Sequence, residues 1–447
     1  MVPNPVNALA ASLLLALPAG LAAQTFAGPP ERLTDSTANF RLSRNPGGSL
    51  AFDATRDVLH LVYWQGGLET QLATPSAIFH REWTPVGGWG EATIVDDSFV
   101  DIGDGPQRMG GREPSLALDP ATGEAWVAWH DHRHSNPLPP GNGIDNLEIY
   151  ADRKQAGGAF SPADIRLTTT AAGTNGDNGY SPSIVALPGG GVAVAWNDFH
   201  FNPVVSDIFL RVSDAAGAFS PADPVPGVRL TDGSARTGAL ANWSFADVEA
   251  RGDGSLGVLW TAGTGGAAPV YFALVPTPPG LVAEQVIAEA TAGFFDPPRL
   301  VGAPSGDLWA VYTKRVGTDR DIEARRLPAG SSTWDAPRTL VGGGARQEHP
   351  HLAVNGEGQL VLVHIDETDG RHVRLAVLDA SGTELASEIV TDAAGPWQRP
   401  VVALDATGKP FVAWEEDTGG DAAGDIWARI PARDASAGTT EWEAMRW

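Results

Sequence analysis

Cysteine is absent from this chain of 447 residues, and basic residues are scarce. The lack of cysteine excludes disulfide scaffolds, Cys-ligated zinc sites, haem-attachment motifs and thiol nucleophiles. The chain has 30 Lys and Arg against 54 Asp and Glu, which gives a formal net charge of −24. So acidic a chain lacks the positive footprint of a nucleic-acid-binding protein, and we expect no nucleic-acid partner. After residue 23 no apolar run is long enough to cross a bilayer, so we expect no membrane span.

The first 23 residues differ from the rest because they carry no charged side chain. An apolar stretch from Ala8 to Ala22 ends in small residues, as a secretory signal peptide does before its cleavage site. We therefore predict a signal peptide over residues 1–23 and a single domain over residues 24–447 of a secreted, extracellular or periplasmic protein. A buried N-terminal strand or a mis-assigned start codon is the alternative. We expect the mature protein to be a monomer.

Glycine and proline are abundant, with 53 and 35 residues, while 43% of the chain is hydrophobic. This composition favours many short strands joined by turns over long helices. One unit recurs seven times: a short apolar strand, a Gly/Asp turn, and a second strand that ends in an aromatic or histidine side chain. For example, Pro114–Asp119 leading to Trp129 matches Pro400–Asp405 leading to Trp414. The second strands end, about 50 to 67 residues apart, at Trp64, Trp129, Trp196, Trp260, Tyr312, His364 and Trp414.

Each unit continues with a third and a fourth strand. Apolar and polar residues alternate in the third strand, as in Asp207–Leu210 and Asp425–Ala428, which is a strand period. The sequence therefore predicts an all-β fold, a seven-bladed β-propeller of four-stranded antiparallel blades, with its weakest third strand near Val270–Leu274. A propeller ring must close. Glu31–Asp35 has the pattern of a fourth strand without the three strands before it, so it can complete the last blade, and Glu441–Arg446 competes for the same place.

The turns before the fourth strands resemble the BNR or Asp-box turns of the sialidase superfamily. The best copy is Gly330–Pro337, although the Asp of the box is missing there. Copies at Gly158–Pro162 and Gly217–Pro221 keep only the glycine and an aromatic residue. This resemblance covers most of the mature chain and implies the propeller fold. It says little about activity, because in this family the boxes lie on the face away from the site.

Blade two carries the sharper part of the resemblance. Arg112-Glu113-Pro114 looks like the Arg-Ile-Pro start of a sialidase, whose arginine binds the substrate carboxylate. Arg133 stands where the family has its second arginine, and Asp145 falls in the loop that carries its catalytic aspartate. The resemblance implies that Arg112 and Arg133 point into the mouth of the central channel, where guanidiniums hold an acidic sugar. It also implies that Asp145 reaches the same cavity as a general acid/base.

Two features weigh against sialidase chemistry. The family pairs a Tyr nucleophile with a Glu late in the chain, whereas none of the five tyrosines lies in the last two blades. Arg399-Pro400 opens blade seven much as Arg112 opens blade two, so the motif is also explained by how the blades pack and turn. A propeller-type polysaccharide lyase is an alternative, with His132, His200 and Tyr180 as candidate bases.

Metal binding is a weaker hypothesis. His130, Asp131, His132 and His134 follow the second strand of blade two, where alternate side chains share a side. A polar loop explains them without an ion, so we predict no metal site. The acidic loops Asp96-Asp97 and Asp101–Gly105 could hold calcium, but neither has the EF-hand spacing. No cofactor is predicted, and calcium is the alternative that stays open.

Propeller geometry gathers the loops that follow the second and fourth strands on one face. Aromatic, arginine and carboxylate side chains fall on that face, as acidic sugars require. The candidate catalytic residues are Asp145, Tyr180 and Glu348. The candidate substrate-binding residues are Arg112, Arg133, Asp131, His132, Arg346, Arg399, Trp243 and Trp397. Our hypothesis is a secreted, sialidase-like propeller that binds or cleaves extracellular, acidic glycans, and a non-catalytic interaction or scaffold propeller is its rival.

Overall fold

The structure is a computed structural model. It describes residues 26–34, 40–43, 48–65, 76–97, 100–101, 106–107, 111–131, 133, 147–168, 179–199, 206–220, 227–232, 245–261, 268–276, 279–291, 296–417 and 424–432. The predicted signal peptide lies outside these residues.

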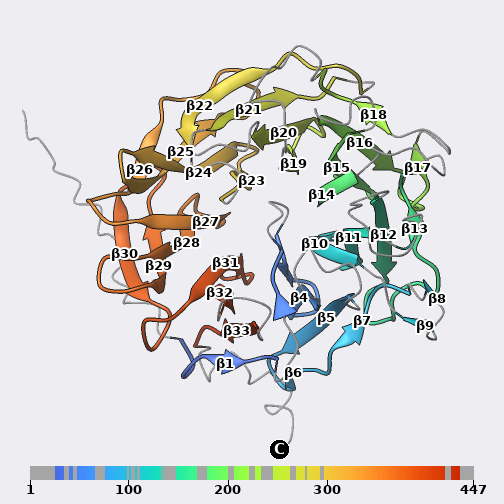
Figure 1. Ribbon diagram of the computed structural model, residues 1–447, viewed down its shortest axis with the longest axis horizontal. Coiled ribbons are helices and arrows are strands. Elements are labelled where there is room, and N and C mark those ends of the chain that lie inside the picture. The colour runs from blue at the N-terminus through green and yellow to red at the C-terminus, as the bar shows by residue number, and fades with distance from the viewer. Residues whose placement is uncertain are drawn as a thin grey trace, which may run out of the picture.

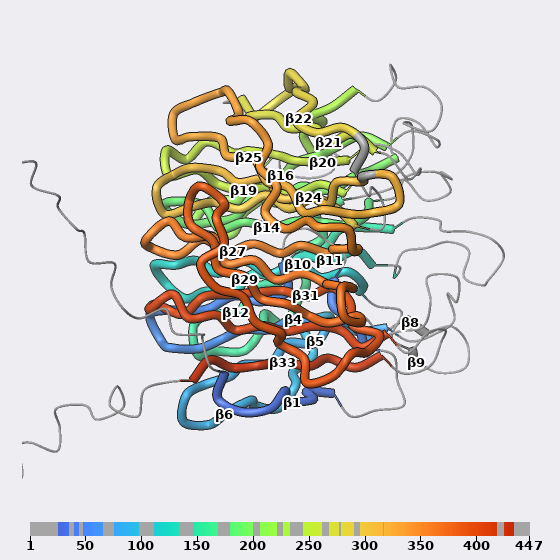
Figure 2. Tube along the Cα trace, turned by 90° about the vertical axis from the view of Figure 1, so that its left-hand side faces the viewer, coloured from blue at the N-terminus to red at the C-terminus, as the bar shows by residue number. Residues whose placement is uncertain are grey.

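The described strands form seven antiparallel, four-stranded blades in a ring, with the first strand of each blade nearest the central axis (Figure 1). Seen from the side, the strands run between two faces of the ring (Figure 2). The predicted all-β, seven-bladed propeller is thus confirmed, and the described residues contain no helix. Accordingly, no helix in the described part of the chain is long and apolar enough to span a membrane.

Within each blade the strands follow one another from the axis outwards. Blade 1 consists of β2 (Phe40–Arg41) with β3 (Leu50–Asp53), β4 (Val58–Gln65), β5 (Ala77–Thr84), and β6 (Gly88–Trp89) with β7 (Thr93–Ile94). Blade 2 consists of β10 (Gly111–Leu118), β11 (Ala125–Asp131), β12 (Glu148–Lys154) and β13 (Ile165–Arg166). Blade 3 consists of β14 (Gly179–Ala186), β15 (Val192–Asp198), β16 (Asp207–Ser213), and β17 (Phe219–Ser220) with β18 (Val228–Arg229). Blades 4 and 5 consist of β19 (Ala246–Ala250), β20 (Leu256–Thr261), β21 (Ala268–Leu274), β22 (Gln285–Thr291); and β23 (Arg299–Gly302), β24 (Leu308–Val316), β25 (Asp319–Leu327), β26 (Arg338–Val341). Blades 6 and 7 consist of β27 (Gln347–Val354), β28 (Leu360–Asp366), β29 (His372–Leu378), β30 (Glu384–Ile389); and β31 (Trp397–Leu404), β32 (Pro410–Glu416), β33 (Asp425–Arg429), β1 (Glu31–Arg32). The pair β8 (Val100–Asp101) and β9 (Pro106–Gln107) lies in the connection from blade 1 to blade 2.

The N-terminal strand closes the ring. Strand β1 pairs antiparallel with β33, so the start of the described chain becomes the outer strand of the last blade. The hydroxyl of Thr34 donates a hydrogen bond to Asp425 at 2.8 Å, and Leu33 is buried in the core cluster that joins blades 7 and 1. The N-terminal candidate for closure is therefore the one observed. The competing segment, Glu441–Arg446, lies outside the described residues.

The aromatic ends of the second strands fill the space between blades. Trp129, Trp196, Trp260 and Trp414 are all 0% exposed. The packing is tight enough that a Cβ on Gly111 would lie 2.2 Å from the Trp129 ring, so only glycine fits there. The repeated marker of the sequence is thus a core residue of each blade, which explains why it recurs at this place.

First strands in four blades start with the same distortion. A residue directly before a proline has a positive φ there, and the pairing with the second strand shifts at that point, in the cases of Glu113 (51°), Ser181 (52°), His349 (54°) and Arg399 (48°). Such a φ is uncommon for residues other than glycine, and a bulge re-aims the side chains at the start of the strand. The ends of the first strands near the axis therefore present side chains that a regular strand would direct elsewhere.

Hydrogen bonds along the inner strands link successive blades. Backbone N–H groups of Ile184, Val248 and Leu300 donate to Ser115 Oγ, Ser183 Oγ and Asp247 Oδ2 of the preceding blade, at 3.1, 3.2 and 2.7 Å. In blade 5 the matching position is Arg299, whose guanidinium has only donors and cannot accept such a bond. A small cavity lies beside it, lined by Asp296, Pro297, Arg299, His349, Pro350, Arg399 and Pro400.

Candidate functional site

Ionisable side chains gather where blades 5 and 6 meet, on the face that holds the ends of the second strands. We call this the mouth cluster, and its members are Asp296, Arg320, Arg346, Glu348, His349, Glu367 and Arg371. Glu348 is its centre and comes from the start of β27. The arginines come from the hairpin of blade 5, the connection into blade 6 and the hairpin of blade 6.

Three guanidiniums surround the Glu348 carboxylate. Nη1 of Arg320 and Nη2 of Arg346 each lie 2.5 Å from Oε1, and Nη1 of Arg371 lies 3.7 Å from Oε2. The Glu348 side chain is only 5% exposed, whereas the Arg346 side chain is 46% exposed. The buried carboxylate thus holds guanidiniums, and the Arg346 guanidinium also faces solvent.

A second carboxylate shares these arginines. Glu367 forms an ion pair with Arg371 and lies 3.8 Å from Nη1 of Arg346. Around Glu348 three guanidiniums therefore share two carboxylates, while Asp296, the third carboxylate of the mouth cluster, lies beside His349. Such a place favours an anion, because planar guanidiniums bind carboxylate and sulfate oxygens in pairs.

Trp397 adjoins the cluster from blade 7. Nε of Arg371 donates to the carbonyl of Trp397 at 2.8 Å, and the Trp397 indole donates to the carbonyl of Ala393 at 2.9 Å. Its ring meets the rings of Trp414 and Trp427 edge-on at 6.3 and 6.0 Å. The indole is half-buried and fixed in orientation, beside an arginine of the cluster.

His349 lies between two carboxylates of the mouth cluster. Its Nδ1 is 3.7 Å from Oδ1 of Asp296, and its Nε2 is 3.9 Å from Oε2 of Glu348. Burial lowers the pKa of His349 to about 3, although the Glu348 charge acts in the opposite direction. Burial also raises the pKa of Asp296, while hydrogen bonds from Thr313 and the His349 backbone lower it. The imidazole is therefore neutral near pH 7 and borders the inner cavity.

Arg399 lies deeper and ties blade 7 to blade 1. Its Nη1 donates to Glu415 Oε2 at 2.9 Å and to the carbonyl of Leu42 at 3.3 Å. Glu415 in turn accepts the N–H of Leu42 at 3.1 Å. Burial raises the pKa of Glu415, and the charges of Arg399 and Arg41 oppose this. Arg399 lines the cavity, but its Nη1 already binds protein acceptors.

In blade two the predicted arginines are engaged by their own blade and its neighbour. Arg133 lies over the Tyr150 ring at 4.1 Å and binds carboxylates of Asp131, Asp164 and Asp97 at 2.7, 2.7 and 3.2 Å. Arg112 is 2% exposed and lies over the Trp64 ring at 5.6 Å. Arg133 is therefore matched by three carboxylates within the junction of blades 1 and 2.

The structure describes some of the other residues that were predicted around blade two. Asp131 accepts the Trp129 indole N–H at 3.1 Å and the Arg133 backbone N–H at 2.8 Å. Tyr180 is 9% exposed and contacts His130 with ring centroids 5.8 Å apart. Four predicted residues lie outside the described residues, namely His132, Asp145, His200 and Trp243.

A tyrosine and a glutamate, the two residue types that sialidases pair, are hydrogen-bonded in blade 5. Tyr312 donates to Glu323 at 3.2 Å. Tyr312 is only 1% exposed, however, and packs in the core cluster between blades 4 and 5. Burial raises its pKa far above the usual range. This pair is a core hydrogen bond and does not face the mouth as a nucleophile.

The sequence alone therefore predicted part of the mouth cluster. Glu348, Arg346 and Trp397 were predicted, and the structure links them through Arg371. Arg371, Arg320, Glu367 and Asp296 were missed. The sequence did contain a signal for two of these residues, because Arg320 and Arg371 each lie at the start of a third strand just after a short hairpin.

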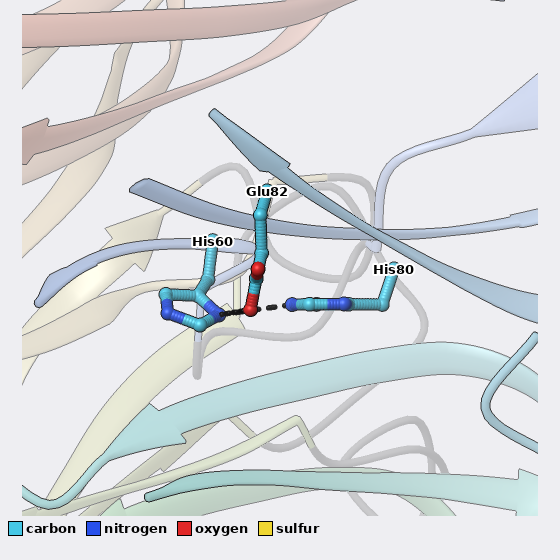
Figure 3. Close-up of side chains that lie close together, drawn as sticks. All are labelled: His60, His80 and Glu82. Carbon is cyan, nitrogen blue, oxygen red and sulfur yellow. Dashed lines mark hydrogen bonds and ion pairs between the residues drawn. The ribbon is translucent and has the colours of Figure 1, made fainter. Parts of the chain in front are cut away.

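A histidine cluster in blade 1 has the composition of a metal site. His60, His80 and Glu82 bring their ligand atoms within 4.8 Å of one another (Figure 3). Nδ1 of His60 lies 2.9 Å from Nε2 of His80 and 3.6 Å from Oε1 of Glu82. Both histidines are buried, which lowers the pKa of His60 to about 4 and that of His80 well below its usual range. Neutral imidazoles of this kind are potential ligands.

Two cations block this cluster as a metal site. Arg56 is anchored on Asp53 and on the carbonyl of Gly123, and its Nη2 lies 3.2 Å from His60 Nε2. A guanidinium only donates, so Nε2 must accept and Nδ1 must carry the proton, which then points to His80. Lys154 also binds Glu82 at 2.7 Å. A proton and an ammonium therefore occupy the places that a metal would need.

Comparisons with known proteins support the fold. No protein-family model matches the sequence, and no curated protein is similar to it. Similar solved structures include an ulvan lyase bound to -[GlcA(1-4)Rha3S]- (11% identity, 89% of this chain and 97% of that chain, TM-score 0.52). They also include the polysaccharide lyase Uly1 (12% identity, 86% and 90%, TM-score 0.50) and a leech intramolecular trans-sialidase (14% identity, 92% and 69%, TM-score 0.48). At these identities the likeness to the two lyases shows the propeller fold alone.

Proposed function

We propose that the protein is a secreted propeller that binds acidic glycans at the mouth cluster. The observation that carries this is the group of Arg320, Arg346 and Arg371 around Glu348, with the Arg346 guanidinium open to solvent. Buried charges are costly unless they are paired, and the pairing around Glu348 leaves the Arg346 guanidinium partly open to solvent. A carboxylate or sulfate group of a sugar would complete it.

Trp397 supports a sugar rather than a small inorganic anion. An indole beside an arginine suits a sugar, because pyranose rings pack on aromatic side chains and the arginine would bind the acidic substituent. The ulvan lyase structure supports the ligand class at the level of fold alone, because it holds an acidic polysaccharide. A protein partner is the rival ligand, since exposed Trp and Arg also anchor protein interfaces.

Affinity measurements on the mature chain test this proposal. We would titrate polyglucuronate, a sulfated polysaccharide and a sialylated oligosaccharide calorimetrically, with neutral dextran as the ligand control. Arg346→Ala removes the most exposed guanidinium and should weaken acidic-glycan binding about 10-fold, which corresponds to loss of a charge-assisted contact. Arg338→Ala is the matched control, because Arg338 binds Asp335 and the Ala380 carbonyl at the outer strand of blade 5. The proposal fails if no acidic glycan binds or if both variants bind equally well.

Arg112→Ala tests the location that the sialidase resemblance implies. If the ligand sits on blade two, this variant should weaken binding about 10- to 150-fold and Arg346→Ala should not. If the ligand binds around Glu348, Arg346→Ala should weaken binding more than Arg112→Ala does. A thermal melt of each variant shows that the comparison is between folded proteins.

A further inference from the structure

We propose that Asp296 and His349 form a proton-transfer pair that makes the mouth cluster catalytic, with a uronate residue of the bound glycan as substrate. This inference rests on the proposed function. It assigns a reaction to the same site and names a residue, His349, that would take a proton from the sugar.

The backbone and side chain of His349 are both oriented by Asp296. The His349 N–H donates to Oδ2 of Asp296 at 2.9 Å, and the Thr313 hydroxyl donates to the same oxygen. The other oxygen, Oδ1, lies 3.7 Å from His349 Nδ1. A carboxylate on this side favours the tautomer with the proton on Nδ1, which leaves the lone pair of Nε2 as the base. Distances slightly beyond hydrogen-bond length are common before a ligand is bound.

The surroundings of His349 suit a base that becomes charged during the reaction. The ring is neutral in the free protein, because burial and the charges of Arg399, Arg371 and Arg299 disfavour protonation. Once protonated, it would lie between the carboxylates of Asp296 and Glu348. These two carboxylates offset part of the cost that burial and the arginines place on the imidazolium formed in the transition state. His349 also differs from the blade 1 histidines, since its ring forms no hydrogen bond to the described residues.

The matching reaction is β-elimination. A uronate has an acidic C5–H beside its carboxylate, and guanidiniums of Arg346 and Arg371 would neutralise that carboxylate and increase the acidity. Nε2 of His349 takes the C5 proton, the C–H electron pair forms the C4=C5 double bond, and the C4–O4 bond breaks with its electrons going to oxygen. The imidazolium then returns the proton to O4. One chain ends in an unsaturated uronate, the other gains a reducing end, and no external oxidant or water is consumed.

Turnover assays test the pair. Wild-type protein incubated with polyglucuronate should produce the ultraviolet absorbance of a conjugated uronate, because H5 and O4 of glucuronate lie on the same face of the ring, where one imidazole reaches both. His349→Asn should reduce the rate by at least about 100-fold, with binding changed by less than about threefold. We choose Asn because it tolerates the positive φ of 54° at this position. Asp296→Asn should shift the acidic limb of the pH–rate profile, as expected for a positioning residue.

The outcomes separate this inference from the proposed function. Binding of polyuronates without any unsaturated product in the wild type would overturn the proton-transfer pair and leave acidic-glycan binding standing. Full turnover by folded His349→Asn would also overturn it. Absence of acidic-glycan binding would overturn both. Arg338→Ala serves as the control that should keep turnover and binding.

Discussion

The junction of blades 1 and 2 and the mouth cluster of blades 5 and 6 hold the same types of side chain in opposite states. At the junction, His60 donates to His80, and Arg133 binds three aspartates. In the mouth cluster, the ring of His349 has carboxylates near both nitrogens at 3.7 and 3.9 Å, and Arg346 is 46% exposed. The named groups at the junction are buried against protein partners, whereas the Arg346 guanidinium of the mouth cluster is also open to solvent.

This difference shows that burial of histidine or arginine does not by itself mark a functional site. A perturbed pKa also arises in structural networks. What separates the two regions is whether the atoms that would do chemistry already have partners within the protein. The sialidase resemblance points to blade two, but Arg133 binds three aspartates there, and we therefore propose the ligand site in blades 5 and 6.

Removal of Arg133 should have the largest effect on stability. Arg133→Ala would leave the carboxylates of Asp131, Asp164 and Asp97 close together without their cation, and we expect a loss of about 3 kcal/mol in the free energy of unfolding. Acidic-glycan affinity should stay within about threefold of wild type. Denaturant unfolding and calorimetric titration measure the two quantities. Arg346→Ala should show the converse, and a stable Arg133→Ala that loses glycan affinity would contradict the comparison.

Acidification should destabilise the junction through His60. The pKa of His60 is lowered to about 4 in the folded protein, chiefly by burial, against the ordinary value of 6.5. The unfolded chain therefore binds more protons between these pH values, so the stability from neutral His60 is present above pH 6.5 and is lost as the pH falls to 4. The size is about 3 kcal/mol. His60→Gln should flatten the pH dependence of the unfolding free energy in this window, and an unchanged slope would contradict the assignment.

Loss of one imidazole at the junction should cost less. His80→Leu leaves the buried Nδ1–H of His60 without its acceptor, and we expect the free energy of unfolding to fall by about 1–3 kcal/mol. His372→Leu is the matched control, because His372 is only partly buried and bonds the Thr391 hydroxyl where solvent can replace it. Chemical denaturation of both variants measures the two losses in the free energy of unfolding. Equal losses would show that the His60–His80 bond has no special weight.

The fold was predictable because its signals are local and repeated. Each second strand ends in a buried ring, so the seven markers counted in the sequence correspond to β4, β11, β15, β20, β24, β28 and β32. The third strand of blade 4, the weakest in the sequence, is β21. Closure by Glu31–Arg32 was one of two predicted alternatives, because the pattern of a fourth strand is present there without the first three.

The site was predictable only in part, because its contacts cross blades. Glu348 and Arg346 could be placed on the mouth face from the loop order alone. That Arg320 reaches Glu348 from the neighbouring blade depends on side-chain directions that a single sequence does not contain. The same limit applies to Arg133, whose partners Asp164 and Asp97 lie 31 and 36 residues away in the chain.

The smallest predicted effect concerns zinc at the histidine cluster of blade 1. In the wild type, Arg56 forces Nδ1 of His60 to keep its proton, so added Zn²⁺ should leave the melting temperature unchanged near neutral pH. Arg56→Ala would allow the proton to move to Nε2 and free Nδ1 as a ligand beside His80 and Glu82. Lys154 would still compete for Glu82, so we expect weak binding that stabilises this variant by less than about 1 kcal/mol. Thermal melts with and without Zn²⁺, with Mg²⁺ as the control ion, measure this. A zinc-dependent shift in the wild type would show that Arg56 does not close the cluster, and the contrast between the two regions would then rest on arginine alone.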